Sequence, residues 1–230
     1  MKTLVSLVRG NHYFFLPFVA WLAIGATMQI VFFSKEELFL GINSVHAPLF
    51  DPFFSYFTYL GDGCAFGLMI LVLLLLRKYR LFLMAGLTLL VVAIIVQVIK
   101  HQMGAPRPMA YFPDTSLIHT VTGVRVHKSL SFPSGHTATA FGMFCFLAMA
   151  IRNKTASLVF FLLALTAAWS RIYLAQHFFE DVYIGSIIGT FSCVLVFFTF
   201  SLVKGRTPSS GRVEESEPAM QPLPGFNAPV

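Results

Sequence analysis

The chain has 230 residues, of which 57% are hydrophobic and only 11% are charged. Soluble domains average roughly 45–50% apolar and 25% charged residues, so this composition excludes an ordinary soluble protein and indicates a polytopic membrane protein. The formal net charge of +6 does not indicate nucleic-acid binding, because the basic residues lie in short clusters between apolar runs.

The hydropathy pattern predicts an all-α membrane bundle of about six transmembrane helices. Each apolar run is close in length to the number of residues, about 20, that a helix needs to cross about 30 Å of hydrocarbon. The first run follows Lys2 and Arg9, as in a signal peptide, but it is long and no small-residue cleavage site follows, so we expect a retained helix. The predicted spans are residues 13–33, 57–76, 81–99, 134–151, 156–175 and 182–203.

Prolines separate the first two spans. Pro48, Asp51 and Pro52 interrupt residues 35–54, so this segment is expected to be short and interfacial. Residues 207–230 are rich in Pro, Ser and Glu without a helical period. The sequence therefore predicts one membrane domain, residues 1–206, and a disordered cytoplasmic tail, residues 207–230.

Basic residues in the short loops predict the orientation in the inner (plasma) membrane. Short cytoplasmic loops are enriched in Lys and Arg, so both termini are expected in the cytoplasm. The residues that set this orientation are Lys2, Arg9, Arg77, Lys78, Arg80, Arg152, Lys154, Lys204 and Arg206. The opposite side also carries Lys100, Arg107, Arg125, Lys128 and Arg171, and positive charge there requires another explanation.

The first candidate cluster is KHQMGAPRP, after the third span. Lys100 ends that span, and Arg107 stands seven positions later between Pro106 and Pro108. The prolines stop helix continuation, so the guanidinium projects from a stiff loop. A guanidinium makes paired hydrogen bonds to phosphate, and a lysine adds a compact charge. Taken alone, either residue is better explained as a charge that reaches the interface or the solvent.

The second cluster is SLSFPSGHTATAF, residues 129–141, where a polar loop meets the fourth span. Ser134 is a good N-cap for a helix that begins near Gly135, and a helix N-terminus attracts anions. Gly135 lets an anion approach the backbone closely. His136 lies in the first turn, where it can donate or accept a proton. An ordinary cap followed by a buried histidine is an equal explanation of this motif alone.

The third cluster is SRIYLAQHFFEDV, which joins the fifth and sixth spans. His177 and Asp181 are four residues apart, so on a helical turn the carboxylate can hold one imidazole nitrogen and leave the other free. Arg171 precedes them and adds a guanidinium. In isolation, Arg171 and Asp181 would be explained as an interfacial ion pair. Because all three clusters fall on the same predicted side of the membrane, however, they predict a catalytic phosphate-binding site at the periplasmic boundary.

These segments resemble the three signature motifs of the type 2 phosphatidic acid phosphatase superfamily. The matches are K-x6-RP, PSGH and SR-x5-H-x3-D, in order and with the right internal spacing, over about 80 residues. The resemblance implies an integral-membrane phosphatase that needs no metal or other cofactor. It also implies that His177 attacks phosphorus to form a phosphohistidine, that Asp181 orients it and that His136 protonates the leaving oxygen. The implied phosphate-binding residues are Lys100, Arg107, Ser134, Gly135 and Arg171.

The substrate is expected to be a lipid phosphate or diphosphate in the outer leaflet. His119, Arg125, His127 and Lys128 on the loop 109–132 could contact a second phosphate or a sugar, which makes undecaprenyl diphosphate the first expectation. A merely solvated loop is the simpler explanation of these charges. Phosphatase action on lipid A, phosphatidic acid or phosphatidylglycerol phosphate remains open, as does phosphate transfer to another lipid.

Two readings outside lipid phosphatases are less well supported. A vanadium-dependent haloperoxidase would share the oxyanion pocket, but the apolar spans favour a membrane lipid enzyme. A transporter would carry charges at the middle of several helices and repeated halves, and neither is seen. The expected partners are the bilayer and its lipid phosphate, and the oligomeric state is left open. Among smaller features, Asp62 is expected to cap a helix, and Gly185 and Gly189 to permit close helix packing.

Overall fold

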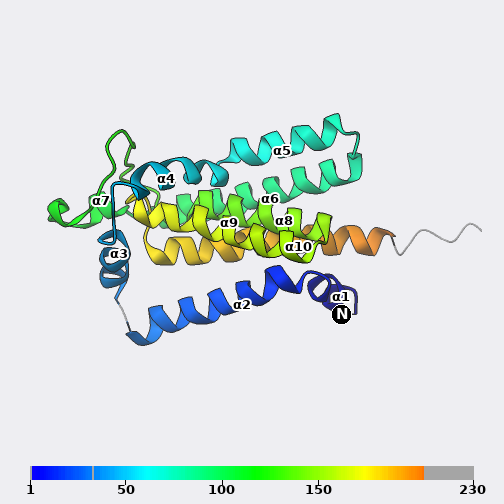
Figure 1. The fold of residues 1–230 in the computed structure, drawn as a ribbon, viewed down its shortest axis with the longest axis horizontal. Coiled ribbons are helices and arrows are strands. Elements are labelled where there is room, and N and C mark those ends of the chain that lie inside the picture. Colours follow the sequence, from blue (N-terminus) through cyan, green and yellow to red (C-terminus); the bar gives the residue numbers. More distant parts are fainter. Residues whose placement is uncertain (1, 33, 205–230) are drawn as a thin grey trace, which may run out of the picture.

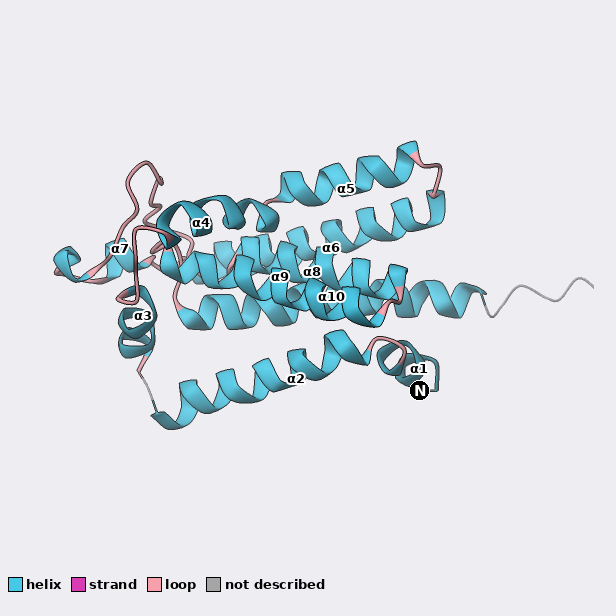
Figure 2. Ribbon diagram, viewed as in Figure 1, coloured by secondary structure: helices cyan, strands magenta, loops and turns pink. Residues whose placement is uncertain are grey.

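The structure is a computed structural model that describes residues 2–32 and 34–204 (Figure 1). Within these ranges all regular structure is helical, and no strand occurs (Figure 2). The predicted all-α membrane fold is therefore confirmed. The predicted tail, residues 207–230, lies outside the described residues.

Among the described residues, four long apolar helices can each cross a membrane by length and composition. They are α2 (His12–Thr27), which continues into the π-helical turn η1 (Met28–Phe32), α6 (Tyr79–Met103), α9 (Lys154–Tyr173) and α10 (Phe179–Lys204). A fifth span is formed if α4 (Phe50–Phe57) and the 3-10 turn η2 (Thr58–Gly61) are joined to α5 (Gly63–Leu75) across a bend of 52°. The predicted span 57–76 is thus bent rather than straight.

The predicted fourth span corresponds to α8 (Gly135–Ile151), which has only 17 residues. It is shorter than the about 20 residues that a full crossing requires. Twelve of its 17 residues are buried, because α8 packs against α6, α9 and α10. Helix α8 is therefore the core of the bundle, surrounded by the longer helices.

Small residues bring α10 unusually close to α8. A Cβ atom at Gly185 would lie 2.7 Å from the carbonyl oxygen of Ser134, and one at Gly189 would overlap the carbonyl oxygen of Ala138. Real Cβ contacts of this kind essentially never occur. Both glycines are therefore required for the two backbones to touch, as the sequence predicts, and this contact fixes the start of α8 against the start of α10.

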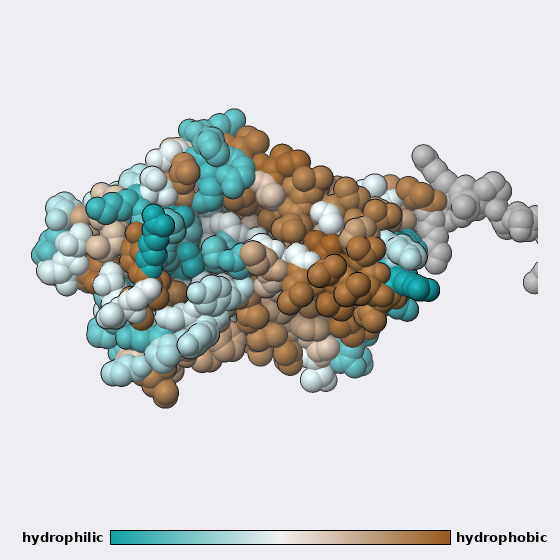
Figure 3. Space-filling model, turned by 90° about the horizontal axis from the view of Figure 1, so that it is seen from above, coloured by the Kyte–Doolittle hydropathy of each residue, from teal (hydrophilic) through white to brown (hydrophobic). Residues whose placement is uncertain are grey.

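The bundle has two different ends. Figure 1 places α1 (Lys2–Arg9), the α5–α6 turn and the last turns of α10 at one end. The opposite end holds α3 (Lys35–Asn43), α4, α7 (Pro108–Tyr111) and the loop that contains η3 (Thr115–Leu117). Figure 3 shows hydrophilic residues gathered over that second end and hydrophobic residues over the middle of the bundle.

The interfacial segment predicted between the first two spans is formed by α3, a loop and α4. Helix α3 begins with a capping box, in which Ser34 Oγ accepts from the Glu37 backbone N–H and Glu37 accepts from the Ser34 N–H. Pro52 falls in the first turn of α4, where a proline costs no helical hydrogen bond. In Figure 1, α3 lies across the end of the bundle rather than along it.

Candidate active site

The PSGH segment forms the start of α8, as expected. Ser134 is the N-cap, and its Oγ accepts from the Thr137 N–H at 3.3 Å and from the Thr137 hydroxyl at 2.9 Å. Gly135 and His136 occupy the first turn, so the unpaired N–H groups of this helix end lie beside them. The backbone N–H of Ser134 donates to the Asp181 carbonyl oxygen at 2.9 Å. This bond ties the second motif directly to the third.

His177 and Asp181 form a buried pair at the start of α10. Nδ1 of His177 lies 3.3 Å from Oδ2 of Asp181, and both side chains are almost fully buried. The same Oδ2 accepts from the Phe178 backbone N–H at 2.9 Å and from the Ser131 hydroxyl at 2.5 Å. The carboxylate therefore holds the imidazole at Nδ1. The other ring nitrogen, Nε2, has no hydrogen-bond partner among the described residues.

Lys100 and Arg107 are held by the chain that leads into α8. Lys100 lies in the last turn of α6, is buried, and donates to the Leu130 carbonyl oxygen at 2.5 Å. Arg107 precedes α7, and its Nε donates to the Ser129 carbonyl oxygen at 2.8 Å. These bonds place the charges of the first motif next to the residues that precede PSGH.

Arg171 is buried near the end of α9. Its Nη1 donates to Thr58 Oγ1 of η2 at 2.5 Å, while its Nε has no hydrogen-bond partner among the described residues. Within the described residues, no ion pair joins Arg171 to Asp181. The interfacial ion pair considered from the sequence therefore does not form. The guanidinium keeps a free donor, which can serve an anion.

The three motifs meet at His177, because Ser134 bonds the Asp181 carbonyl oxygen and Arg107 bonds Gln176, the residue before His177. Burial lowers the pKa of His177 well below its usual value, and the positive charges of Arg107, Arg171 and Lys100 lower this pKa further. His136 acts in the same direction. All four residues are thus electrostatic neighbours of one imidazole. We call the site formed by Lys100, Arg107, Arg171, His136 and His177 the cationic cup.

Comparison with known proteins identifies the family. The profile of the PAP2 superfamily matches residues 81–204, which include all three motifs. The chain belongs to the PAP2 superfamily.

Two bacterial relatives agree with this assignment. The chain is 29% identical over 182 residues to a lipid A 4'-phosphatase of Bacteroides thetaiotaomicron, which covers 75% of this chain and 80% of that protein. It is 28% identical to a lipid A 4'-phosphatase of Porphyromonas gingivalis, over 70% of this chain and 71% of the relative. This PAP2 protein is therefore a membrane phosphatase.

Solved structures show the same fold. Aquifex aeolicus LpxE superposes with a TM-score of 0.65 at 29% identity, covering 74% of this chain and 98% of LpxE. The PAP2 type phosphatidylglycerolphosphate phosphatase from Bacillus subtilis superposes with a TM-score of 0.56 at 22% identity, covering 90% of this chain and 98% of that one. The second likeness concerns the fold alone.

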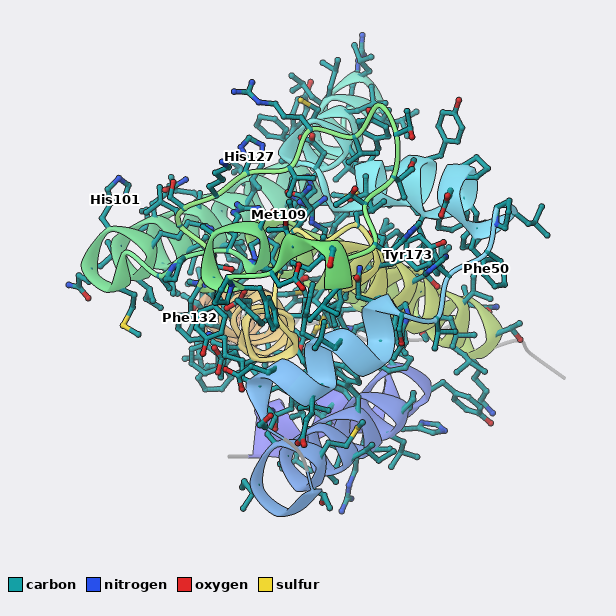
Figure 4. The ribbon with its side chains drawn as sticks, turned by 90° about the vertical axis from the view of Figure 1, so that its left-hand side faces the viewer. Phe50, His101, Met109, His127, Phe132 and Tyr173 are labelled. Atoms are coloured by element: carbon teal, nitrogen blue, oxygen red, sulfur yellow. The ribbon has the colours of Figure 1, made fainter. Side chains whose placement is uncertain are left out.

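The charged residues of the loop 109–132 of this PAP2 protein lie in two different settings. Nε2 of His119 lies 3.0 Å from Oδ1 of Asp51, and its ring stacks on His46, so His119 belongs to the scaffold that joins α4 to the loop. Arg125, His127 and Lys128 are exposed. Partial burial and the charge of Arg107 lower the pKa of His127, whose place on the loop is marked in Figure 4.

Three residues of the site were missed by the sequence analysis. Gln176 is buried, accepts from Arg107 Nη1 at 3.1 Å and donates to the Arg125 carbonyl oxygen at 3.0 Å. Ser131 holds Asp181, and Thr58 holds Arg171. Ser131 and Gln176 lie inside or beside the motifs, and their polarity in an apolar setting was a usable signal. Thr58 lies in a distant segment and gave none.

The predicted helix cap at Asp62 is confirmed. Asp62 is the N-cap of α5 and accepts from the Cys64 N–H at 2.9 Å, as predicted. Within the described residues, no group of three or more His, Cys, Asp or Glu side chains is placed to hold a metal ion.

Proposed function

We propose that this PAP2 protein removes a phosphate from a lipid A-type substrate, a phosphorylated sugar that carries acyl chains. The observation that carries the proposal is the buried His177, with a free Nε2, among three cations that can hold phosphate oxygens. The names of the two bacterial relatives support lipid A rather than undecaprenyl diphosphate, the first expectation from the sequence. Lipid A was one of the alternative substrates that the sequence left open.

His177 is the proposed nucleophile. Since Nδ1 faces the Asp181 carboxylate, the proton of a neutral imidazole sits there and Nε2 carries the lone pair. Attack forms the phosphorus–Nε2 bond and breaks the bond between phosphorus and the leaving oxygen, which takes a proton from His136. Asp181 stabilises the positive charge that His177 acquires. Water activated by His136 then releases phosphate and restores His177.

Lys100, Arg107 and Arg171 are proposed to stabilise the transition state. Phosphoryl transfer spreads negative charge over three equatorial oxygens, and preorganised donors in a water-poor site stabilise that charge strongly. The backbone at Ser134 and Gly135 adds the N-terminus of α8. Because these groups supply the positive charge, the proposed reaction needs no metal ion.

The site is proposed to face the periplasm. The basic residues Lys78, Arg152 and Lys154 lie at turns of the opposite end of the bundle, the end that positive charge normally directs to the cytoplasm. Both termini would then be cytoplasmic, and the cationic cup would meet lipid headgroups of the outer leaflet.

A phosphate-release panel tests the proposed substrate. Purified protein is given lipid A, undecaprenyl diphosphate, phosphatidic acid and phosphatidylglycerol phosphate, with His177→Ala as the inactive variant. His101→Ala is the matched control, because His101 is exposed and bonds only within its own helix. The proposal predicts the highest kcat/KM for lipid A and loss of activity in His177→Ala alone. Preference for undecaprenyl diphosphate would overturn the choice of lipid, and an active His177→Ala would overturn the mechanism.

A further inference from the structure

An apolar groove opens at the end of the bundle that holds the cationic cup. A cavity of about 440 Å³ lies between η1, α3, α4 and α9, and its size is in the range of small-molecule sites. Its lining includes Leu38, Ile42, Phe54, Trp169 and Tyr173. A second cavity of about 280 Å³ adjoins it between α4 and α9 and shares Phe54 and Trp169. We call the two cavities together the α4–α9 groove.

The groove and the cationic cup lie next to the same two elements, the α4–η2 segment and α9. Phe54 lines the groove and lies four residues before Thr58, which holds Arg171 of the cup. Tyr173 lines the groove and lies two residues after Arg171 on α9. At 1.5 Å of rise per residue, these steps are about 6 Å and about 3 Å along their helices. The groove and the cup therefore both adjoin the contact between η2 and α9.

Most polar groups of the groove lie where it approaches the headgroup end. There the Tyr173 hydroxyl donates to Asp51 at 2.5 Å, and Asp51 also bonds His119. Figure 4 shows Tyr173 and Phe50 on the side of the molecule where α3 and α4 flank α9. Glu37 on α3 and Thr166 on α9 also line the groove, the other lining residues are apolar, and α9 is a membrane span. An anion site beside an apolar groove matches an amphipathic ligand with one charged head.

We propose that the α4–α9 groove binds an acyl chain of the same lipid whose phosphate occupies the cationic cup. This inference rests on the proposed function in requiring a lipid phosphate, but it does not depend on which headgroup is preferred. The groove then contributes binding energy through the acyl chain, so that long-chain substrates are favoured over short-chain ones.

A larger side chain at position 41 would fill part of the groove. Gly41 lies on α3, lines the larger cavity, and has no atom within 4 Å of the place where a Cβ would stand. Gly41→Phe therefore adds an aromatic ring to the groove without a backbone clash, and Gly41→Leu adds a smaller side chain. Gly86→Phe is the matched control, because Gly86 on α6 also has open space and lies outside the groove.

The binding test uses the two tryptophans of the chain, Trp21 and Trp169. Trp21→Phe leaves Trp169 in the groove as the fluorophore. Phosphatidic acid with brominated acyl chains is titrated into the protein in detergent. The inference predicts saturable quenching of Trp169 that Gly41→Phe weakens about tenfold, comparable to losing contact with about two methylenes, while Gly86→Phe leaves it unchanged. Equal quenching in Gly41→Phe and Gly86→Phe would overturn the inference.

A kinetic test separates this inference from the proposed function. Phosphate release is compared for dipalmitoyl and dihexanoyl phosphatidic acid. Gly41→Phe and Gly41→Leu are expected to lower kcat/KM for the long-chain substrate and to leave the short-chain substrate near the wild-type value, which also shows that the variants fold. An equal loss on both substrates would contradict the groove. A failure to cleave lipid A would contradict the proposed substrate and leave this ratio and the quenching unaffected.

Discussion

At the scale of single residues, one carboxylate oxygen organises the site. Oδ2 of Asp181 faces His177 and also accepts from Ser131 and from the Phe178 backbone. A carboxylate with several donors is fixed in one position, so the imidazole beside it is fixed too. Ser131 is therefore expected to position the proposed nucleophile through Asp181.

Ser131→Ala tests this role. Loss of a hydrogen bond to a charged group costs about 1.5–3 kcal/mol, so kcat should fall about ten- to hundredfold with little change in KM. Ser192→Ala is the control, since the Ser192 hydroxyl is equally buried but bonds only the Ile188 carbonyl of its own helix. Steady-state kinetics that show the same kcat in Ser131→Ala and wild type would remove Ser131 from the account.

The lowered pKa of His177 predicts a pH dependence of stability. The folded chain keeps this imidazole neutral where the unfolded chain, with a pKa of about 6.5, binds a proton, so stability is lost as the pH falls below that value. From pH ~7.5 to ~5.5 the loss due to one such group is at most about 1.4 kcal/mol. Denaturation in detergent should show a smaller acid destabilisation in His177→Ala than in His101→Ala. Identical pH profiles would contradict a buried neutral His177.

The residues of the signature motifs could be located from the sequence because their spacing is local. Pro106 and Pro108 frame Arg107, and four residues separate His177 from Asp181. Gln176 lies inside a motif but could not be paired with its partner in this way, and Thr58 could not be located at all. Their partners, Arg107 and Arg171, lie 69 and 113 positions away along the chain and are reached only through the packing of whole helices.

At the scale of elements, the contact between α8 and α10 positions the two histidine motifs. Hydropathy located α2, α6, α8, α9 and α10, because an apolar run of this length has few other folds. It did not reveal the bend between η2 and α5, since hydropathy carries no information on helix direction. Asp62, a cap inside an otherwise apolar run, was the one signal of that break.

Gly189→Ala tests the α8–α10 contact. The added methyl group would overlap the Ala138 carbonyl oxygen, so the helices must separate, at a cost of about 1–3 kcal/mol. The melting temperature and the activity should both fall, because Ser134 and Asp181 lie at this contact. Gly86→Ala, which meets no atom within 4 Å, should leave both unchanged. A Gly189→Ala variant as stable as Gly86→Ala would show that the helices are not packed this closely.

At the scale of the whole molecule, the hydrophilic end and the basic turns support the proposed direction of the protein in the membrane. The charge pattern predicts that direction from the sequence. The choice of lipid could not be predicted in the same way, because the groove that we assign to an acyl chain is built from α3, α4 and α9 and has no local motif.

Cysteine labelling tests the direction. The three native cysteines are replaced by alanine, and His127→Cys or Lys78→Cys is introduced at exposed positions of opposite ends. A membrane-impermeant maleimide should label His127→Cys from the periplasm and Lys78→Cys only after the inner membrane is disrupted. The reverse pattern would place the cationic cup in the cytoplasm and contradict the proposed location.

The central claim is that His177 carries the phosphoryl group between the two halves of the reaction. Substrate labelled with radioactive phosphate is mixed with the enzyme, quenched within one turnover, and the labelled peptide is mapped. The account predicts an acid-labile, base-stable label on His177 that is present in wild type and in Ser192→Ala and absent from His177→Ala. A label that persists in His177→Ala, or one mapped to another residue, would contradict the account.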